Sequence, residues 1–299
     1  MNKMQFKTVG LGEVLYDVLP SGEKLLGGAP ANFAYISAQL GNKSYLASRV
    51  GNDADGRRVL EKLKTDGIDI SFAQIDEVRE TGRVKVSFQN GQPAYRINEN
   101  SAWDFLSLTE EWKSLAENCD AVCFGSLAQR NPVSKKTINE FIKLTKPDCL
   151  RVFDINLRQN FYTKNTLSES LEAADILKLN DEELPKVVGL FSIKGENDLQ
   201  LIENLRKQFD LSAICLTRGA KGSLLVSEEE ISDHPGVKTE VVNTIGAGDA
   251  FTATLVHGLL KNWNLDKINK NANTVGAFVA SKSGAMPDFK EFDLTNFTE

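Results

Sequence analysis

The stretch Asn243–Leu260, NTIGAGDAFTATLVHGLL, joins a glycine-containing turn to a segment with helical periodicity. Phe251, Leu255 and Leu259 recur along one face of that segment, which predicts a helix over 247–261. The small residues of the turn let a ligand approach the backbone closely, and the unpaired N–H groups of a first helical turn favour negative charge. The stretch is therefore typical of a site that holds a phosphoryl group.

Asp249 follows directly after Gly246, Ala247 and Gly248. One interpretation is an acidic residue that complements the helix dipole. The other is a general base that takes a proton from a substrate hydroxyl while the adjacent N–H groups stabilise the transferring phosphoryl group. In-line attack requires these two functions to be neighbours, which the sequence GAGD provides. The turn alone does not decide between the two interpretations.

The composition indicates an ordinary globular protein. The chain has 299 residues, of which 41% are hydrophobic and 25% charged, and a net charge of -6. No long Lys/Arg cluster is present, which disfavours nucleic acid and anionic membranes as partners. The N-terminus does not resemble a signal peptide, and no run reaches the ~18 apolar residues of a membrane span. We expect a cytoplasmic protein that binds a small molecule.

The cysteines and the second histidine are expected to be structural. Cys119, Cys123, Cys149 and Cys215 fall in apolar, strand-like surroundings without a CxxC pair, which favours buried thiols over a metal site or disulfide. His257 falls within the helical apolar period and is expected to be packed or partly exposed, not a ligand.

Short apolar runs alternate with helical periodicity along most of the chain. This alternation predicts an α/β fold with a doubly wound, mostly parallel sheet flanked by helices. The predicted strands are 8–11, 45–50, 121–124, 150–154, 176–179, 213–217 and 223–226. The predicted helices are 29–39, 56–66, 134–146, 182–188, 199–208, 247–261 and 266–281.

Two segments depart from this alternation. Residues 13–26 and 82–97 are predicted hairpins, the second turning at the sequence QNGQ over 89–92. A small sheet built from them could close over a site as a lid, or the strands could be edge strands without a gating role. Because no linker composition appears elsewhere, we expect a single domain over 1–299 with these two hairpins inserted.

Other nucleotide-binding motifs are absent from the sequence. It contains no GxxxxGK[ST] motif, no GxGxxG after the first predicted strand, and no protein-kinase HRD or DFG set. A phosphate-binding interpretation therefore depends on the GAGD turn.

Two motifs at opposite ends of the chain carry a family resemblance. GGAPANFA over 27–34 and NTIGAGDAF over 243–251 resemble the two signature regions of the ribokinase-like (PfkB) carbohydrate kinases, in the same order. GEVLYDVLP and GGAPANFA resemble the bacterial fructokinases in particular. Further blocks similar to the family extend the resemblance over almost the whole length: RVGNDADGRRVLEKLKTDGID, FDINLRQNFY, KLNDEE and TRGAKGSLL.

The resemblance implies a ribokinase-like fold with a small β lid and an ATP-dependent sugar kinase, with D-fructose to fructose 6-phosphate as the leading reaction. It matches Asp249 to the catalytic base and the preceding Gly-Ala-Gly to the anion hole. Asn180 and Glu183 match the element that holds Mg²⁺ and phosphate through water, which suits the oxygen preference of Mg²⁺. From the residues alone, KLNDEE would be an N-capped helix start with acidic residues.

On the sugar side, the resemblance implies binding by Asp17, Gly27, Gly28 and Asn32. Carboxylate and amide groups suit sugar hydroxyls, and the glycines allow close approach of the ring. GGAPAN by itself is equally a tight turn that caps a helix. Arg158 matches a basic position that could meet the substrate or the transferred phosphate, and the alternative is a surface ion pair.

On the nucleotide side, Thr217, Gly219 and Gly222 match the loop that the family uses for ATP. Asn273 falls on the predicted helix that would wall the adenine pocket.

A monovalent cation, K⁺, is also implied near the anion hole, around Asn243, Ile245, Ser281 and Gly284. The family signature usually begins with Asp where this chain has Asn243, and a threonine-like residue often stands at the position of Ile245. The loss of charge at Asn243 leaves K⁺ binding open, because backbone oxygens and the amide oxygen of Asn243 could still bind the ion. It does not affect the role of Asp249 as the base.

Several alternatives stay open from the sequence. A 2-keto-3-deoxygluconate kinase could pair Arg158 with the substrate carboxylate, and a ribose or nucleoside kinase would share the same motifs. A non-catalytic sugar or nucleotide sensor could keep the fold without turnover. An apolar face on the hairpins would also predict a homodimer that meets through the lid.

Overall fold

A computed structural model describes residues 5–89, 92–290 and 292–297 of the chain. Its central sheet has eight strands in the order β14-β13-β12-β11-β10-β9-β1-β4. All neighbours are parallel except the β12–β13 and β13–β14 pairs, so the predicted α/β fold with a mostly parallel sheet is confirmed. The strands are β1 (Lys7–Leu11), β4 (Lys43–Ala47), β9 (Ala121–Gly125), β10 (Leu150–Asp154), β11 (Ile176–Asn180), β12 (Ala213–Thr217), β13 (Ser223–Ser227) and β14 (Ile231–His234).

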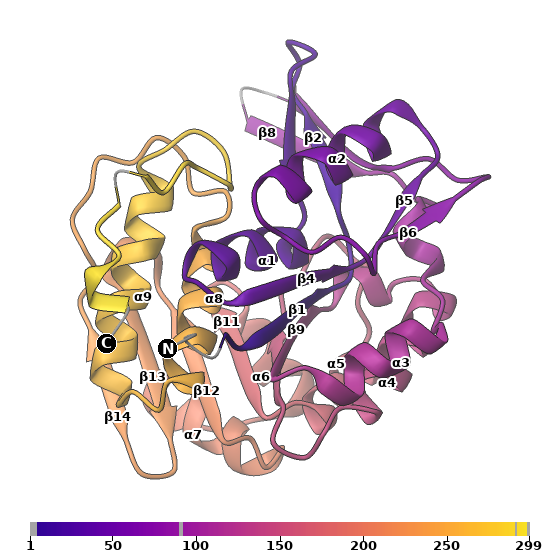
Figure 1. Cartoon of the computed structure of the whole chain (residues 1–299). Helices are drawn as coiled ribbons and strands as arrows, with labels where there is room; N and C mark the ends of the chain where they lie inside the picture. Colours follow the sequence, from indigo (N-terminus) through magenta and orange to yellow (C-terminus); the bar gives the residue numbers. More distant parts are fainter. Residues whose placement is uncertain (1–4, 90–91, 291, 298–299) are drawn as a thin grey trace.

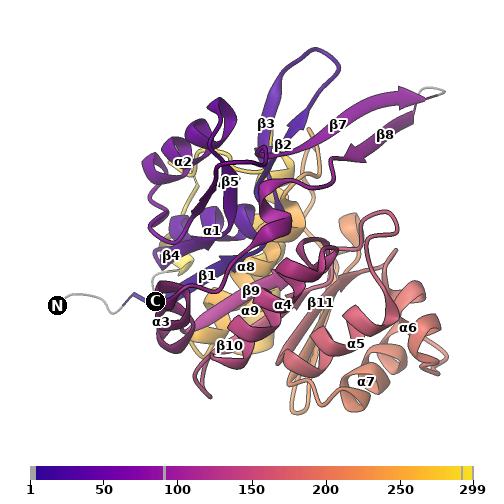
Figure 2. The same ribbon diagram turned by 90° about the vertical axis from the view of Figure 1, so that its right-hand side faces the viewer.

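Helices cover both faces of this sheet (Figures 1 and 2). Successive strand residues point to opposite faces, so Val122 and Phe124 join one core while Ala121 and Cys123 join the other. The first core is covered by α3 (Glu110–Asn118), α4 (Pro132–Lys143), α5 (Lys164–Ala173), α6 (Leu184–Phe191) and α7 (Asp198–Gln208). The second is covered by α1 (Ala29–Gln39), α2 (Ala54–Thr65), α8 (Ala247–Leu260) and α9 (Leu265–Ala280).

A separate four-stranded sheet, which we call the small sheet, stands off one end of the molecule (Figure 1). Its order is β3-β2-β7-β8, and its strands come from the two segments that depart from the βα alternation. Residues 90 and 91 of the expected QNGQ turn lie outside the described residues. The strands are β2 (Leu15–Val18), β3 (Lys24–Gly27), β7 (Gly82–Gln89) and β8 (Gln92–Ile97).

The predicted strand over 45–50 is wrong as a single element. β4 ends at Ala47, and the chain then enters β5 (Arg49–Gly51), which pairs with β6 (Gln74–Asp76) in a third sheet. Burial continues from Tyr45 through Ser48 to Val50, with only Arg49 partly exposed, so the pattern of the sequence does not mark the change of sheet.

Besides short 3-10 turns, four described elements were not predicted: α3, α5, β6 and β14. Helix α3 begins where the Thr109 hydroxyl accepts the N–H of Trp112, and α5 where Thr163 accepts the N–H of Thr166. Both helices are short and largely polar, so their apolar period is weak. Strand β14 is an exposed antiparallel edge, which pairing with β13 stabilises more than its own composition does.

Candidate active site

The carboxyl ends of the parallel strands share one edge of the sheet, where open α/β sheets bind ligands. Helix α8 begins at this edge with Gly246 in the left-handed region (φ 79°). A Cβ on Gly246 would lie 2.5 Å from Cβ of Ala285, so only glycine fits against that loop. None of the described side chains caps this helix start. The N–H of Ala247 donates to the carbonyl oxygen of Thr244 at 3.3 Å, and the neighbouring N–H groups of this turn can face a phosphoryl group.

Asp249, in the first turn of α8, meets the N-terminal motif through Asn32 on α1. The Nδ2 atom of Asn32 donates to Oδ2 of Asp249 at 2.7 Å, across 217 residues of sequence. Asn32 is 3% exposed, and its Oδ1 atom has no hydrogen-bond partner among the described residues. The structure thus joins the two motifs and leaves a buried acceptor beside Asp249.

The pKa of Asp249 is raised to about 6. Desolvation of the carboxyl group is the largest cause and the charge of Asp154 adds to it, while Lys178, Asn32 and Arg158 act in the opposite direction. A carboxylate with this pKa is ionised at neutral pH and is a stronger base than an exposed aspartate. The group is therefore suited to accept a proton from an alcohol.

Sequence reasoning missed a cluster of three buried polar side chains next to the anion hole: Asp154, Lys178 and Thr252. Nζ of Lys178 lies 3.1 Å from Oδ1 of Asp154, and the Thr252 hydroxyl donates to Oδ2 of Asp154 at 2.8 Å. A Cβ on Gly248 would lie 3.0 Å from Nζ of Lys178. The charges of Asp154, Glu183 and Asp249 raise the pKa of Lys178, so it carries its charge here. The sequence did contain an indication of this ion pair: Asp154 and Lys178 are charged residues within otherwise apolar parts of β10 and β11.

The Glu183 carboxylate joins the loop after β10 to the end of β11 at Asn180. Oε1 of Glu183 accepts the N–H of Leu157 at 2.8 Å, and Oε2 accepts the N–H of Asn180 at 2.9 Å. Burial raises the pKa of Glu183, which is 3% exposed. Among the described residues, no three His, Cys, Asp or Glu groups are placed to bind a metal directly. This donor set fits Mg²⁺ that is held mostly by water and phosphate oxygens.

The predicted sugar-side residues lie where the small sheet meets α1. Gly28 has φ 104°, and a Cβ there would lie 2.6 Å from the carbonyl oxygen of Glu13. A Cβ on Gly27 would lie 3.1 Å from Oδ2 of Asp17, a residue of β2. Burial raises the pKa of Asp17, and the charge of Arg158 opposes that rise. The structure therefore brings these residues to the edge that also holds Asn32.

Glu13 is a second residue that the sequence did not single out. It is 2% exposed, and its Oε2 atom has no hydrogen-bond partner among the described residues. Desolvation raises its pKa to about 7, Asp249 adds to the rise, and hydrogen bonds from the N–H groups of Glu13 and Ala29 oppose it. Arg158 is exposed and influences the carboxyls of Glu13, Asp17 and Asp249.

The predicted nucleotide-side residues separate into two groups. Thr217 lies at the end of β12 opposite Asn180, and Gly219 has open space around its Cα. Gly222 has φ 80°, and a Cβ there would overlap the carbonyl oxygen of His234 at 1.9 Å. Asn273, by contrast, is buried and its Nδ2 donates to Oγ of Ser223 and to Asn269. These bonds tie the amide nitrogen of Asn273 to β13 and α9, and its place at the adenine pocket stays a prediction.

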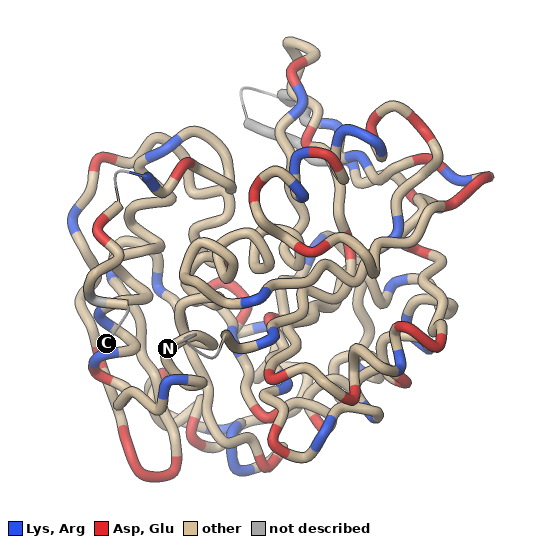
Figure 3. The backbone as a smooth tube through the Cα atoms, in the orientation of Figure 1, with Lys and Arg blue, Asp and Glu red and all other residues tan. Residues whose placement is uncertain are grey.

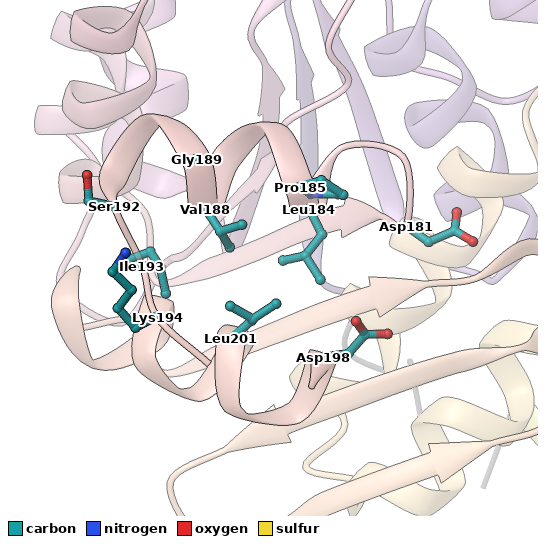
Figure 4. Close-up of a pocket in the computed structure, with 10 residues that line it drawn as sticks. All are labelled: Asp181, Leu184, Pro185, Val188, Gly189, Ser192, Ile193, Lys194, Asp198 and Leu201. Atoms are coloured by element: carbon teal, nitrogen blue, oxygen red, sulfur yellow. The ribbon is translucent and has the colours of Figure 1, made fainter. Parts of the chain in front are cut away.

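Two cavities lie near this edge of the sheet. The smaller, about 10 Å³, is lined by residues of α1 and the ends of β9 and β10 together with Asp249. The larger, about 390 Å³, lies between α6 and α7 (Figure 4). Leu184, Val188 and Leu201 form its apolar centre, with Asp181 and Asp198 at one end. It includes none of the predicted site residues.

The sequence profile of the pfkB family carbohydrate kinases matches residues 3–291. The chain belongs to the pfkB family of carbohydrate kinases. It is therefore an enzyme that phosphorylates a sugar, and the resemblance stated from the two end motifs is confirmed.

Relatives of known structure support this assignment. An uncharacterized sugar kinase of Pyrococcus horikoshii is 32% identical and covers 100% of this chain and 98% of its own. Its crystal structure has a TM-score of 0.81 over 95% of this chain and 94% of that one, and it was also solved with ATP.

Fructokinases are also similar to this pfkB kinase. That of Escherichia coli is 28% identical over 95% of this chain and 96% of its own. That of Vibrio cholerae, solved with fructose, ADP and a calcium ion, is 26% identical with a TM-score of 0.80 over 95% of each chain. A double mutant of the latter was solved with fructose, ADP and a potassium ion.

The remaining expectations concern the cysteines, the histidine and the surface. All four cysteines are buried and free, as predicted, and His257 is packed between Asn42 and the carbonyl oxygen of Phe297. Charges of both signs are interspersed along the chain (Figure 3). No helix in the described part of the chain is long and apolar enough to cross a membrane.

Proposed function

We propose that this kinase transfers the γ-phosphoryl group of ATP to D-fructose, giving fructose 6-phosphate and ADP. The 2.7 Å hydrogen bond from Asn32 to Asp249 carries the proposal, because it brings the predicted sugar side to the base at the anion hole. The fructokinase-like N-terminal motifs and the fructokinase relatives favour fructose among the sugars. The residue roles that follow are part of this proposal.

In the proposed reaction, Asp249 takes the proton of the sugar hydroxyl as its oxygen bonds to the γ-phosphorus. The bond from phosphorus to the bridging oxygen of ADP breaks, and ADP leaves with the electron pair. The N–H groups of Gly246, Ala247 and Gly248 stabilise the charge on the transferring group. Asp249 then releases its proton to solvent. General-base catalysis of this kind contributes ~10²–10⁴-fold.

Mg²⁺, when bound, would neutralise phosphate charge, and Asn180 and Glu183 would hold it through water. Thr217, Gly219 and Gly222 would line the nucleotide side. The buried Lys178 ammonium lies beside Gly248 and keeps a positive charge close to the anion hole. Its charge also lowers the pKa of Asp249, so the base is ionised at neutral pH.

The test of fructose is a comparison of acceptors. ADP release should be measured with fructose, ribose, nucleosides and 2-keto-3-deoxygluconate, and fructose should show the highest kcat/KM. A clear preference for another acceptor would reject fructose while leaving the sugar kinase assignment intact.

Arg158 favours 2-keto-3-deoxygluconate as the second candidate. Its side chain is exposed and donates to the neighbouring Leu157 carbonyl oxygen through Nη1 at 3.3 Å, so the rest of the guanidinium could bind a carboxylate. However, the charge of Arg158 already acts on the carboxyls of Glu13, Asp17 and Asp249. That charge balance supports a neutral sugar, and Arg158→Ala should therefore weaken fructose binding less than it weakens binding of an acidic sugar.

We also propose that the chain is one domain in which the small sheet closes over the sugar as a lid. Support comes from Asp17, which lies on β2 yet faces Gly27 beside α1. A homodimer through this sheet, and a cytoplasmic location, stay predictions. Light scattering at assay concentrations would show whether a dimer forms.

The family match argues against the non-catalytic sensor that the sequence left open, because it makes the chain an enzyme that phosphorylates a sugar. Asp249→Asn tests the assigned base, since it should keep sugar and nucleotide binding and lose turnover.

A further inference from the structure

Asn243 connects the segment before α8 to the segment after α9. Its Nδ2 atom donates to the carbonyl oxygen of Lys282 at 2.9 Å. Its Oδ1 atom accepts the N–H of Ile245 at 3.0 Å. Both ends of the side-chain amide are therefore used within the protein.

The same two segments make further contacts. The N–H groups of Val242 and Asn243 both donate to the carbonyl oxygen of Ala280, at 2.9 and 3.2 Å. Gly246 packs so closely on Ala285 that a Cβ would lie 2.7 Å from its Cα atom. Because Gly246 begins the anion hole, these contacts set the position of the N–H groups that would receive the phosphoryl group.

The family resemblance implies a monovalent cation between these segments, and the residues present do not fit one. K⁺ is held by several oxygen atoms in place of its hydration shell. Here the carbonyl oxygen of Lys282 faces an N–H donor of Asn243, and the amide oxygen of Asn243 faces the N–H of Ile245. The amide of Asn243 carries no negative charge, and the segment after α9 adds a positive charge through Lys282, whose Nζ lies 5.3 Å from the centre of the Phe278 ring.

We propose that the Asn243 amide replaces the monovalent cation in this kinase. A direct hydrogen bond joins the two segments that a bound ion would otherwise hold together. The anion hole is then in place without K⁺, and both folding stability and turnover are independent of K⁺. The proposal rests on the chain being a pfkB kinase, and it does not depend on which sugar is the substrate.

The test compares the wild type with Asn243→Asp in potassium chloride and in choline chloride at equal ionic strength. The melting temperature of the wild type should be the same in both salts, with and without ADP. In Asn243→Asp, a carboxylate faces the Lys282 carbonyl, and the two oxygens repel each other unless a cation lies between them. K⁺ should therefore raise its melting temperature saturably, by roughly 2 °C or more, and increase its turnover.

Asn262→Asp is the matched control. Asn262 is exposed beyond the end of α8, so the substitution adds the same charge away from Lys282 and should leave the response to K⁺ unchanged.

A saturable rise in the melting temperature of the wild type with K⁺ would overturn the proposal, as would an Asn243→Asp variant that K⁺ does not affect. If that variant does not fold, the wild type is titrated with Tl⁺, an analogue of K⁺, and binding is followed by thallium NMR. Specific binding of Tl⁺ would refute the proposal, and the absence of specific binding would support it. These readouts need no sugar, so failure of the fructose assignment would leave them interpretable.

Discussion

Asp249→Asn should make the kinase more stable while it removes most of its activity. Folding raises the pKa of this carboxyl from 3.8 to about 6, so the folded protein holds the proton more tightly than the unfolded chain. The stability that this group contributes is present below the pKa of the unfolded chain, 3.8. It is lost as the pH rises through the pKa of the folded protein, about 6. A difference of about two pKa units corresponds to about 3 kcal/mol of destabilisation at neutral pH.

The asparagine variant does not carry this destabilising charge, and its amide oxygen can still accept from Asn32. Unfolding entropies of about 2 cal/mol/K per residue convert 3 kcal/mol to a rise in Tm of about 5 °C for this chain. The difference should be present at neutral pH and disappear in acid, where the wild-type carboxyl is protonated. Turnover should fall by ~10²–10⁴-fold, with sugar and nucleotide binding retained.

Thermal unfolding of both proteins over a series of pH values measures the first effect, and ADP release measures the second. Asp181→Asn is the control, because Asp181 is exposed at the same edge of the sheet and loses the same charge. A variant that melts at or below the wild-type temperature at every pH would refute the assigned desolvation of the Asp249 carboxyl group. Unchanged turnover would refute its role as the base.

The remaining predictions concern the two residues that sequence reasoning missed and the pH profile. Glu13→Gln should raise Tm above neutral pH, and the gain should appear about one pH unit higher than for Asp249→Asn because the pKa of Glu13 is about 7. Lys178→Met should lower the free energy of unfolding by about 3–5 kcal/mol, because it leaves the charge of Asp154 without its ion-pair partner. Adding Asp154→Asn should recover much of that loss. Additive effects of the two substitutions would contradict the ion pair. In the wild type, kcat/KM should fall tenfold per pH unit below an apparent pKa of about 6. In Lys178→Met this fall should begin at a higher pH, because the charge that lowers the pKa of Asp249 is gone. An unchanged pH profile would show that Lys178 does not influence the pKa of the base.

Much of the fold could be predicted because its elements have strong local patterns. The predicted bounds of β10, β12 and α1 match the structure: each strand is a short, mostly apolar segment, and α1 starts directly after Gly28 with Pro30 in its first turn. The strand over 45–50 failed because the sequence shows no turn signal at Ser48, where the chain passes from one sheet to another.

The sequence by itself determined most of the elements and the preference of the GAGD turn for an anion, because periodicity, glycine conformation and helix-terminal charge act over a few residues. Only the tertiary structure decided that Asn32 reaches Asp249, that Lys178 pairs with Asp154, and that the amide of Asn243 bonds to Lys282. These contacts join residues between 24 and 217 positions apart. Their partners are set by strand order and by the packing of α1, α8 and α9 on one face of the sheet, which no local pattern records.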